Sequence, residues 1–191
     1  MTGPVRLAGP NVVLREFRAD DLDDALSVVG DDEVTRWLSF DSRDRDATRQ
    51  MLAAAIERAR LTPRPEYYLA VTLPADDRVI GFGRLGPTGV RAAKLGYALG
   101  AGMWGHGYAT EAARLLTGFA FGPLGLHRVS AAIGPDNDAS IAVVKRLGFS
   151  YEGRLRDHVF TGGAWRDSLL YSVLADEWPP TPAPPVTTPP G

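Results

Sequence analysis

The sequence has no cysteine among its 191 residues, which excludes disulfides, thiolate metal sites and a cysteine nucleophile. It has no apolar run of the roughly eighteen residues that a membrane span requires, and residues 1–17 show no basic start followed by an apolar stretch. Basic and acidic residues nearly balance, at 21 and 23, so there is no broad basic surface for nucleic acid. We therefore expect a cytoplasmic protein without a membrane or nucleic-acid partner.

The remaining composition is that of one ordinary globular domain, with 45% hydrophobic and 23% charged residues. We expect this domain to span residues 1–178. From Pro179 onward, seven of the last 13 residues are proline. Because proline interrupts both strand pairing and helices, we expect a flexible tail over residues 179–191.

Acidic residues are frequent in the first quarter of the chain. Residues 1–50 contain eleven aspartates and glutamates against seven arginines. Because aspartate favours helix N-caps and solvated helix faces, most of these residues are expected in such positions. The alternative is an acidic rim that attracts a cationic amine.

Hydrophobic periodicity predicts alternating strands and helices. Strands are expected over residues 12–17, 67–73, 78–85, 94–99, 128–133, 151–160 and 164–174. Helices are expected after Asp20 or Asp21, over residues 45–60, after the glycine-rich stretch 100–107, and after Asp136 or Asn137 with Gly148 at the end.

The glycine-rich stretch is the most informative segment. Gly100, Gly102 and Gly105 have the G-x-G-x-x-G spacing of a dinucleotide site, but no acid stands near residues 120–127 to bind a ribose. A P-loop is excluded because no lysine followed by serine or threonine comes after the glycines. What remains is a turn whose backbone N–H groups converge on an anion at a helix N-terminus, which suits a pyrophosphate.

Residues 104–112, with the letters WGHGYATEA, resemble the coenzyme A pyrophosphate loop of GNAT acetyltransferases, above all the RimJ/RimL-like branch. Further blocks at 124–129, 137–140, 147–149 and 152–156 follow in the order of that family, and the likeness covers residues 10–178. It implies an α/β (α+β) fold: a twisted, mostly antiparallel sheet of six or seven strands, with helices on both faces. It also implies a V-shaped gap between the fourth and fifth strands.

The resemblance implies an N-acyltransferase that moves an acetyl or another short acyl group from acyl-CoA to a primary amine, without a metal. Backbone N–H groups of Ala98 and Leu99 would hold the pantetheine and polarise the thioester carbonyl. Asn137 would contact the pantetheine arm, and Lys145 or Arg146 a coenzyme phosphate. The loop residues assigned to the coenzyme are Trp104, Gly105, His106, Gly107, Tyr108, Ala109 and Thr110.

Two proton transfers need side chains. Ser140, which could also be a first-turn cap, is the candidate donor to the departing thiolate, and Tyr97, which could also be a packed aromatic, is the alternative. Where related sequences often carry an acid base, this chain has Lys94. Asp157 is the candidate base, but strand alternation lets only one of Asp157 and His158 point inward, and water could relay the proton instead.

The acceptor is the least determined part of the prediction. Trp37 and Phe40 are candidate walls of its pocket, although buried aromatics are common in cores. The amine could belong to a peptide N-terminus or to a small molecule, and the acyl group could be acetyl or succinyl. A non-catalytic coenzyme A binding or sensing module is the alternative function, and homodimer formation stays open.

Overall fold

The computed structural model describes residues 4–178, so the tail predicted at 179–191 lies outside the described residues. The elements, in chain order, are β1 (Arg6–Ala8), β2 (Val13–Glu16), a 3₁₀ turn (Ala19–Asp21), α1 (Leu22–Val29), α2 (Asp32–Thr35), α3 (Arg45–Ala59), β3 (Tyr67–Thr72), β4 (Val79–Pro87), β5 (Ala92–Leu99), a second 3₁₀ turn (Ala101–Met103), α4 (Tyr108–Phe121), β6 (Arg128–Ile133), α5 (Asp138–Arg146), β7 (Ser150–Thr161) and β8 (Ala164–Leu174). No helix in this part of the chain has the length and apolar character needed to cross a membrane.

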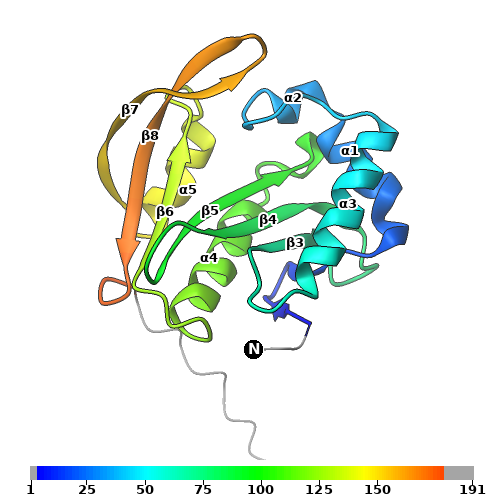
Figure 1. The fold of residues 1–191 in the computed structure, drawn as a ribbon, viewed down its shortest axis with the longest axis horizontal. Helices are drawn as coiled ribbons and strands as arrows, with labels where there is room; N and C mark the ends of the chain where they lie inside the picture. The colour runs from blue at the N-terminus through cyan, green and yellow to red at the C-terminus, as the bar shows by residue number, and fades with distance from the viewer. Residues whose placement is uncertain (1–3, 179–191) are drawn as a thin grey trace, which may run out of the picture.

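Eight strands form one sheet in the order β1-β2-β3-β4-β5-β6-β8-β7 (Figure 1). Within residues 4–178 every neighbouring pair is antiparallel except β5 with β6, which is parallel. The mostly antiparallel sheet predicted from the sequence is confirmed. The strand missing from the predicted set is β1, whose three residues are too few to show a period-two pattern.

Helices cover both faces of the sheet, as predicted. On one face, α1 and α3 pack through Ala25, Val28 and Leu52 against sheet residues that include Phe82 and Ala98. On the other face, α4 and α5 pack on a second core. That core includes Leu14, Leu69, Leu95, Leu116, Phe119, Val129 and Val144. Burial of these two apolar surfaces fixes the strands between the helices.

The predicted gap lies between β5 and β6, the fourth and fifth strands of the predicted set. Parallel pairing joins Ala92–Lys94 to Arg128–Ser130 and then ends, while β5 stays paired with β4 as far as Leu99. The edge of β5 that faces β6 is therefore left without strand hydrogen bonds from Leu95 to Leu99. A ligand with amide groups can pair with such an edge.

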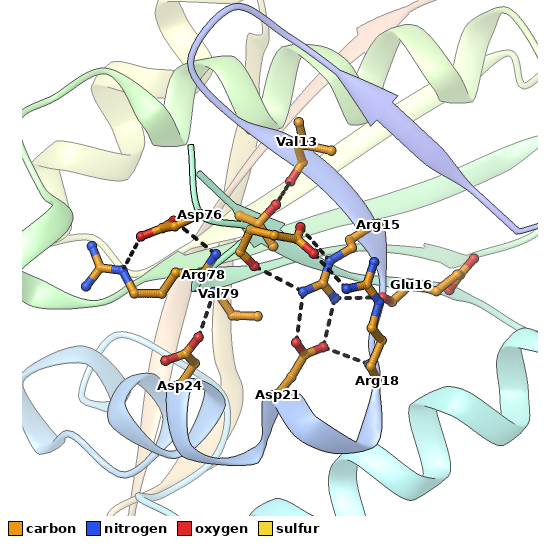
Figure 2. A network of polar contacts seen from close by, with 11 residues as sticks. Val13, Arg15, Glu16, Arg18, Asp21, Asp24, Asp76, Arg78 and Val79 are labelled. Carbon is orange, nitrogen blue, oxygen red and sulfur yellow. Dashed lines mark hydrogen bonds and ion pairs between the residues drawn. The ribbon is translucent and has the colours of Figure 1, made fainter. Parts of the chain in front are cut away.

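A polar network fastens the start of α1 to the sheet (Figure 2). Arg15 on β2 is buried, and its two terminal nitrogens each donate to the Asp21 carboxylate over 2.8 Å, while its Nε donates to Asp77 over 2.9 Å. The bond to Asp21 raises the pKa of Arg15 above its usual value. Asp21 is the N-cap residue of α1, but its side chain accepts no N–H of that helix and binds Arg15 and the backbone N–H of Arg18 instead.

Candidate functional site

A cavity of about 1900 Å³ opens along the gap between β5 and β6. It collects side chains from β4, β5, the start of α4, the segment from β6 to α5, the loop after α2 and the β7–β8 hairpin. The predicted site residues in its wall are Trp37, Phe40, Tyr97, Ala98, Leu99, Trp104, Gly105, Gly107, Tyr108, Ala109, Thr110, Asn137 and Ser140. Three predicted site residues, His106, Lys145 and Asp157, are not in the wall.

The glycine turn forms one end of the cavity. Gly105 and Gly107 have φ values of 80° and 81°, a left-handed conformation that other residues adopt only with strain, and Gly107 is the N-cap of α4. The first N–H groups of α4 have no acceptor inside the helix. The indole nitrogen of Trp104 donates to the Leu99 carbonyl over 2.9 Å, which holds the turn against the end of β5. This end can therefore bind an anion beside the free edge of β5.

Two predicted coenzyme contacts do not line the cavity. The exposed His106 has Nδ1 2.8 Å from the Trp104 carbonyl oxygen, and its ring stacks on Tyr108 with centroids 5.4 Å apart. Lys145 and Arg146 are both exposed on α5, but only Arg146 lines the cavity. Of the two cations in the last turn of α5, Arg146 is the one placed to meet a phosphate.

Glu111 has a structural role beyond its favourable place in the first turn of α4. Its carboxylate accepts from the backbone N–H of Asn11 and Val12, over 2.8 and 3.0 Å, and from the Asn11 side-chain amide over 2.8 Å. The segment before β2 is thereby joined to the helix that starts at the glycine turn.

The middle of the cavity is lined by Tyr97, Asn137 and Ser140. The Asn137 side-chain oxygen accepts from the Ser140 N–H over 3.0 Å and so caps α5, while the Tyr97 hydroxyl donates to the Ser140 carbonyl over 3.3 Å. Burial raises the pKa of Tyr97 to about 12, so its phenol stays protonated at neutral pH. Two hydroxyl groups that can donate a proton or a hydrogen bond thus lie side by side at the gap.

His158, and not Asp157, lines the cavity. The pairing of β7 with β8 is irregular between Leu155 and Val159, and Asp157 there has a φ of 47°. This bulge breaks strand alternation and leaves Asp157 exposed. His158 is half-buried with Nδ1 2.9 Å from the Ser168 hydroxyl, and burial, together with the charge of Lys94, lowers its pKa. Its imidazole is therefore neutral at pH 7 and can accept a proton.

The other end of the cavity, which we call the acceptor end, lies away from the glycine turn between the loop after α2, the β4–β5 strands and the β7–β8 hairpin. Trp37 and Phe40 line it, and the Phe40 and Phe82 rings lie 6.5 Å apart. Asp41 binds the hairpin tip through the Thr161 hydroxyl and the Gly162 N–H, over 2.8 and 2.9 Å.

Arg166 of β8 makes a second contact with the same loop, because its two terminal nitrogens donate to the carbonyls of Arg36 and Leu38. The hairpin and the loop therefore cover the acceptor end together. Loop contacts of this kind connect residues that are far apart in the chain, and the residue pattern gave no sign of them.

The sequence also missed a group of cations at the acceptor end. Arg43, Arg84 and Lys94 all line the cavity there, and burial, with the charge of Arg84, lowers the pKa of Lys94. Arg84 and Lys94 do leave a trace in the sequence, because each is a charged residue inside an otherwise apolar strand. Such a position signals either a strand edge or a polar site.

None of the eleven acids in residues 1–50 lines the cavity, so the prediction of an acidic rim is wrong. These acids serve the fold instead. Asp31 and Asp44 cap α2 and α3, Asp21 binds Arg15, Asp24 accepts from the Val79 N–H, and Asp41 holds the hairpin. Asp31 and Asp44 are helix caps and seven of the eleven acids are exposed, so the other interpretation, helix caps and solvated faces, accounts for most of them.

Comparisons with known proteins give consistent matches. Residues 11–150 match the acetyltransferase (GNAT) domain family. The uncharacterized N-acetyltransferase p20 of Bacillus licheniformis is 29% identical over 170 residues, which cover 87% of this chain and 94% of that protein. The [ribosomal protein uS5]-alanine N-acetyltransferase of Escherichia coli K12 is 29% identical over 117 residues, 60% of each chain.

The structure of Mycobacterium smegmatis RimJ in complex with CoA-disulfide superposes with a TM-score of 0.78 at 28% identity, over 93% of this chain and 88% of that one. The family match includes the glycine turn, β5, β6 and the start of α5. These are the elements that form the gap and its anion-binding end.

Proposed function

The chain belongs to the GNAT acetyltransferase family, as an N-acetyltransferase of the RimJ-like branch. We propose that it transfers an acyl group from acyl-CoA to a primary amine in a ternary complex. Acetyl-CoA is the first candidate for the acyl donor. The observation that carries this proposal is the free edge of β5 beyond Lys94, which runs to Leu99, where Trp104 holds the glycine turn that begins α4. A free strand edge beside an anion-binding helix end suits a ligand that carries amides, a thioester and a pyrophosphate.

The coenzyme would lie along the gap, with its pyrophosphate on the N–H groups of the glycine turn and the first turn of α4. Its pantetheine amides would pair with the free edge of β5 at Ala98 and Leu99, and Asn137 would contact the same arm from α5. Arg146 would meet a phosphate, in place of the exposed Lys145. The backbone N–H groups of β5 would also polarise the thioester carbonyl.

The reaction is a direct attack. The amine nitrogen forms a bond to the thioester carbonyl carbon, the carbon–sulfur bond breaks, and the thiolate leaves with the electron pair. Ser140, with Tyr97 as the alternative, gives a proton to that thiolate and regains one from solvent, while the proton lost by the amine passes to His158 and then to solvent. Proximity and orientation supply much of the rate, since no covalent enzyme intermediate is needed.

The acceptor amine belongs to a peptide N-terminus or to a small molecule. A relative named for the alanine of ribosomal protein uS5 supports an α-amine. A free amino acid and a peptide N-terminus both present this group, and they differ in whether a carboxylate stands beside it.

Two measurements test the proposal. Calorimetric titration with acetyl-CoA should show binding, and thiol release from acetyl-CoA or succinyl-CoA should depend on an added amine from a panel of amino acids, peptides and polyamines. Gly105→Asp should abolish binding, because it adds a negative charge and backbone strain at the phosphate site.

Gly89→Asp is the matched control, because Gly89 also has a positive φ but lies outside the cavity wall. Coenzyme binding without amine-dependent thiol release would overturn the proposal and indicate a coenzyme A binding module instead.

A further inference from the structure

The acceptor end of the cavity is positively charged, although the chain as a whole has a formal net charge of −2. Cations outnumber carboxylates in its wall. The cations are Arg36, Arg43, Arg58, Arg84, Lys94, Arg154 and Arg166, and the carboxylates are Glu66 and Asp167. This excess is the reverse of what a basic peptide or a polyamine would require.

The two carboxylates neutralise only part of the charge. Glu66 is shared between Arg58 and Arg84, at 2.9 and 2.5 Å, and Asp167 pairs with Arg154 at 2.5 Å. Within residues 4–178, Arg43 and Lys94 form no ion pair, and the Nε of Arg43 is buried without a hydrogen-bond partner. Charges held partly away from water favour a counter-ion, and here the protein does not supply one.

Arg84 and Lys94 lie beside an open space over Gly96 of β5. Arg84 on β4 stands opposite Gly96 on β5, and Lys94 comes two residues before Gly96, so all three share one face of the sheet. A side chain on Gly96 would meet nothing within 4 Å. Lys94 and Arg84 also lie close enough for their charges to interact.

Arg43 enters from the loop after α2, where its guanidinium lies 4.7 Å from the centre of the Phe40 ring. Its charge and that of Arg84 both act on the hydroxyl of Tyr68, which stands opposite Arg84 on the neighbouring strand. The cations therefore reach the same part of the cavity from different elements.

Resting on the proposed acyl transfer, we propose that Arg43, Arg84 and Lys94 bind a carboxylate of the acceptor, so that this enzyme acylates a small amine of the amino-acid type. Guanidinium and ammonium groups recognise a carboxylate by charge-assisted hydrogen bonds. The contacts of Asp41 and Arg166 close the hairpin over this end, which favours a compact acceptor. A peptide N-terminus lacks the carboxylate beside its α-amine and would leave Arg43 and Lys94, which have no carboxylate partner in the described residues, without a counter-ion.

The same cations also help the chemistry. A positive surrounding lowers the pKa of a bound ammonium, because it disfavours the charged form. The acceptor is therefore held more easily as the neutral amine, the form that attacks the thioester.

Paired acceptors test the inference, with thiol release from acetyl-CoA as the readout. Alanine is compared with alaninamide, which resembles a peptide N-terminus, and glutamate with glutamine. We expect at least one acid to exceed its amide by about tenfold in kcat/KM. Lys94→Met should remove this preference without changing the affinity for acetyl-CoA. Arg49→Met is the control, because Arg49 is an exposed cation of α3 outside the cavity wall.

Amides or basic peptides that match or exceed both acids would overturn the inference, as would a preference that survives Lys94→Met. A succinyl-CoA arm tests the other possible source of the carboxylate: if Lys94→Met impairs succinyl transfer to neutral amines but not the choice of acceptor, the site serves the donor.

Failure of the proposed function is distinguishable from failure of this inference. If no amine releases thiol, calorimetry on the coenzyme A-loaded protein still compares each acid with its amide. Tighter binding of the acid supports the carboxylate site, and equal binding overturns it.

Discussion

The phenol of Tyr97 donates a hydrogen bond of 3.3 Å to the main-chain carbonyl of Ser140. This bond crosses the gap from β5 to the first turn of α5, so the two side chains considered as proton donors are immediate neighbours. The Tyr97 hydrogen is already directed at that carbonyl. We therefore expect Ser140 to be the donor and Tyr97 to position the turn that carries it.

Ser140→Ala should lower kcat by roughly ten- to a thousandfold and leave the dissociation constant of acetyl-CoA nearly unchanged, because donation to the thiolate matters mainly in the transition state. Steady-state kinetics with calorimetry measures both quantities. Tyr97→Phe is the companion variant and should cost less. An unchanged kcat with a lowered melting temperature would show that Ser140 only supports the helix, and Tyr97 would become the leading donor.

Asn137 is expected to act through both ends of its amide, because its oxygen caps α5 by accepting from Ser140. Asn137→Ala should reduce the free energy of unfolding by about 0.5–2 kcal/mol and weaken coenzyme binding. Asn137→Asp keeps a capping oxygen but removes the amide N–H donors. If those donors hold the pantetheine, Asn137→Asp should weaken acetyl-CoA binding at nearly unchanged stability. Unchanged affinity in both variants would exclude Asn137 from the coenzyme site.

The rate should depend on pH through His158. Its pKa is lowered by burial and by Lys94, so the neutral imidazole persists below the usual histidine value of 6.5. We expect kcat/KM to fall as the pH drops below 6.5 through the lowered pKa of His158. Folding stability should fall in the same direction, because the unfolded chain binds this proton more readily.

His158→Asn should lower kcat/KM and remove the acidic limb from the pH–rate profile. Asp157→Asn is the matched control, since Asp157 is the next residue but is exposed and outside the cavity. If the control loses activity and His158→Asn does not, the base is Asp157.

Asp21→Asn should destabilise the fold by about 3–5 kcal/mol, because it leaves the buried guanidinium of Arg15 without its main counter-charge. Denaturant unfolding of the intact chain measures this loss. Asp76→Asn is the comparison, because its pair with Arg78 is exposed and 3.8 Å long and should contribute at most about 1 kcal/mol. Similar losses in both variants would show that burial of the Arg15 pair is energetically unimportant.

Local patterns were sufficient to predict most of the framework. The strand 128–133 and the helix capped by Asn137 appear as predicted, because alternation, capping and the glycine at position 148 all act over a few residues. Contacts between distant segments were not predictable in this way. Asp21 has a sequence position suited to capping, but its side chain binds Arg15 on another element.

The acceptor end is a second case in which local sequence patterns could not predict contacts between distant segments. Arg43, Arg84 and Lys94 come from a loop and two strands, and only the sheet register brings them together. The choice between Asp157 and His158 depended on regular alternation, and the bulge between Leu155 and Val159 removed that premise. A bulge with a non-glycine residue at positive φ has no clear signature in a single sequence.

The bonds of Glu111 join the proposed coenzyme site to a segment one hundred residues away in the chain. A carboxylate in the first turn of α4 stands near the N–H groups that would receive a pyrophosphate, and an unsatisfied carboxylate there would repel it. Asn11 and Val12 donate three hydrogen bonds to this carboxylate and so stabilise its charge. An N-terminal truncation that removes Asn11 would therefore weaken coenzyme affinity by electrostatic repulsion, most strongly at low salt. This effect is expected although neither Asn11 nor Val12 is expected to touch the coenzyme.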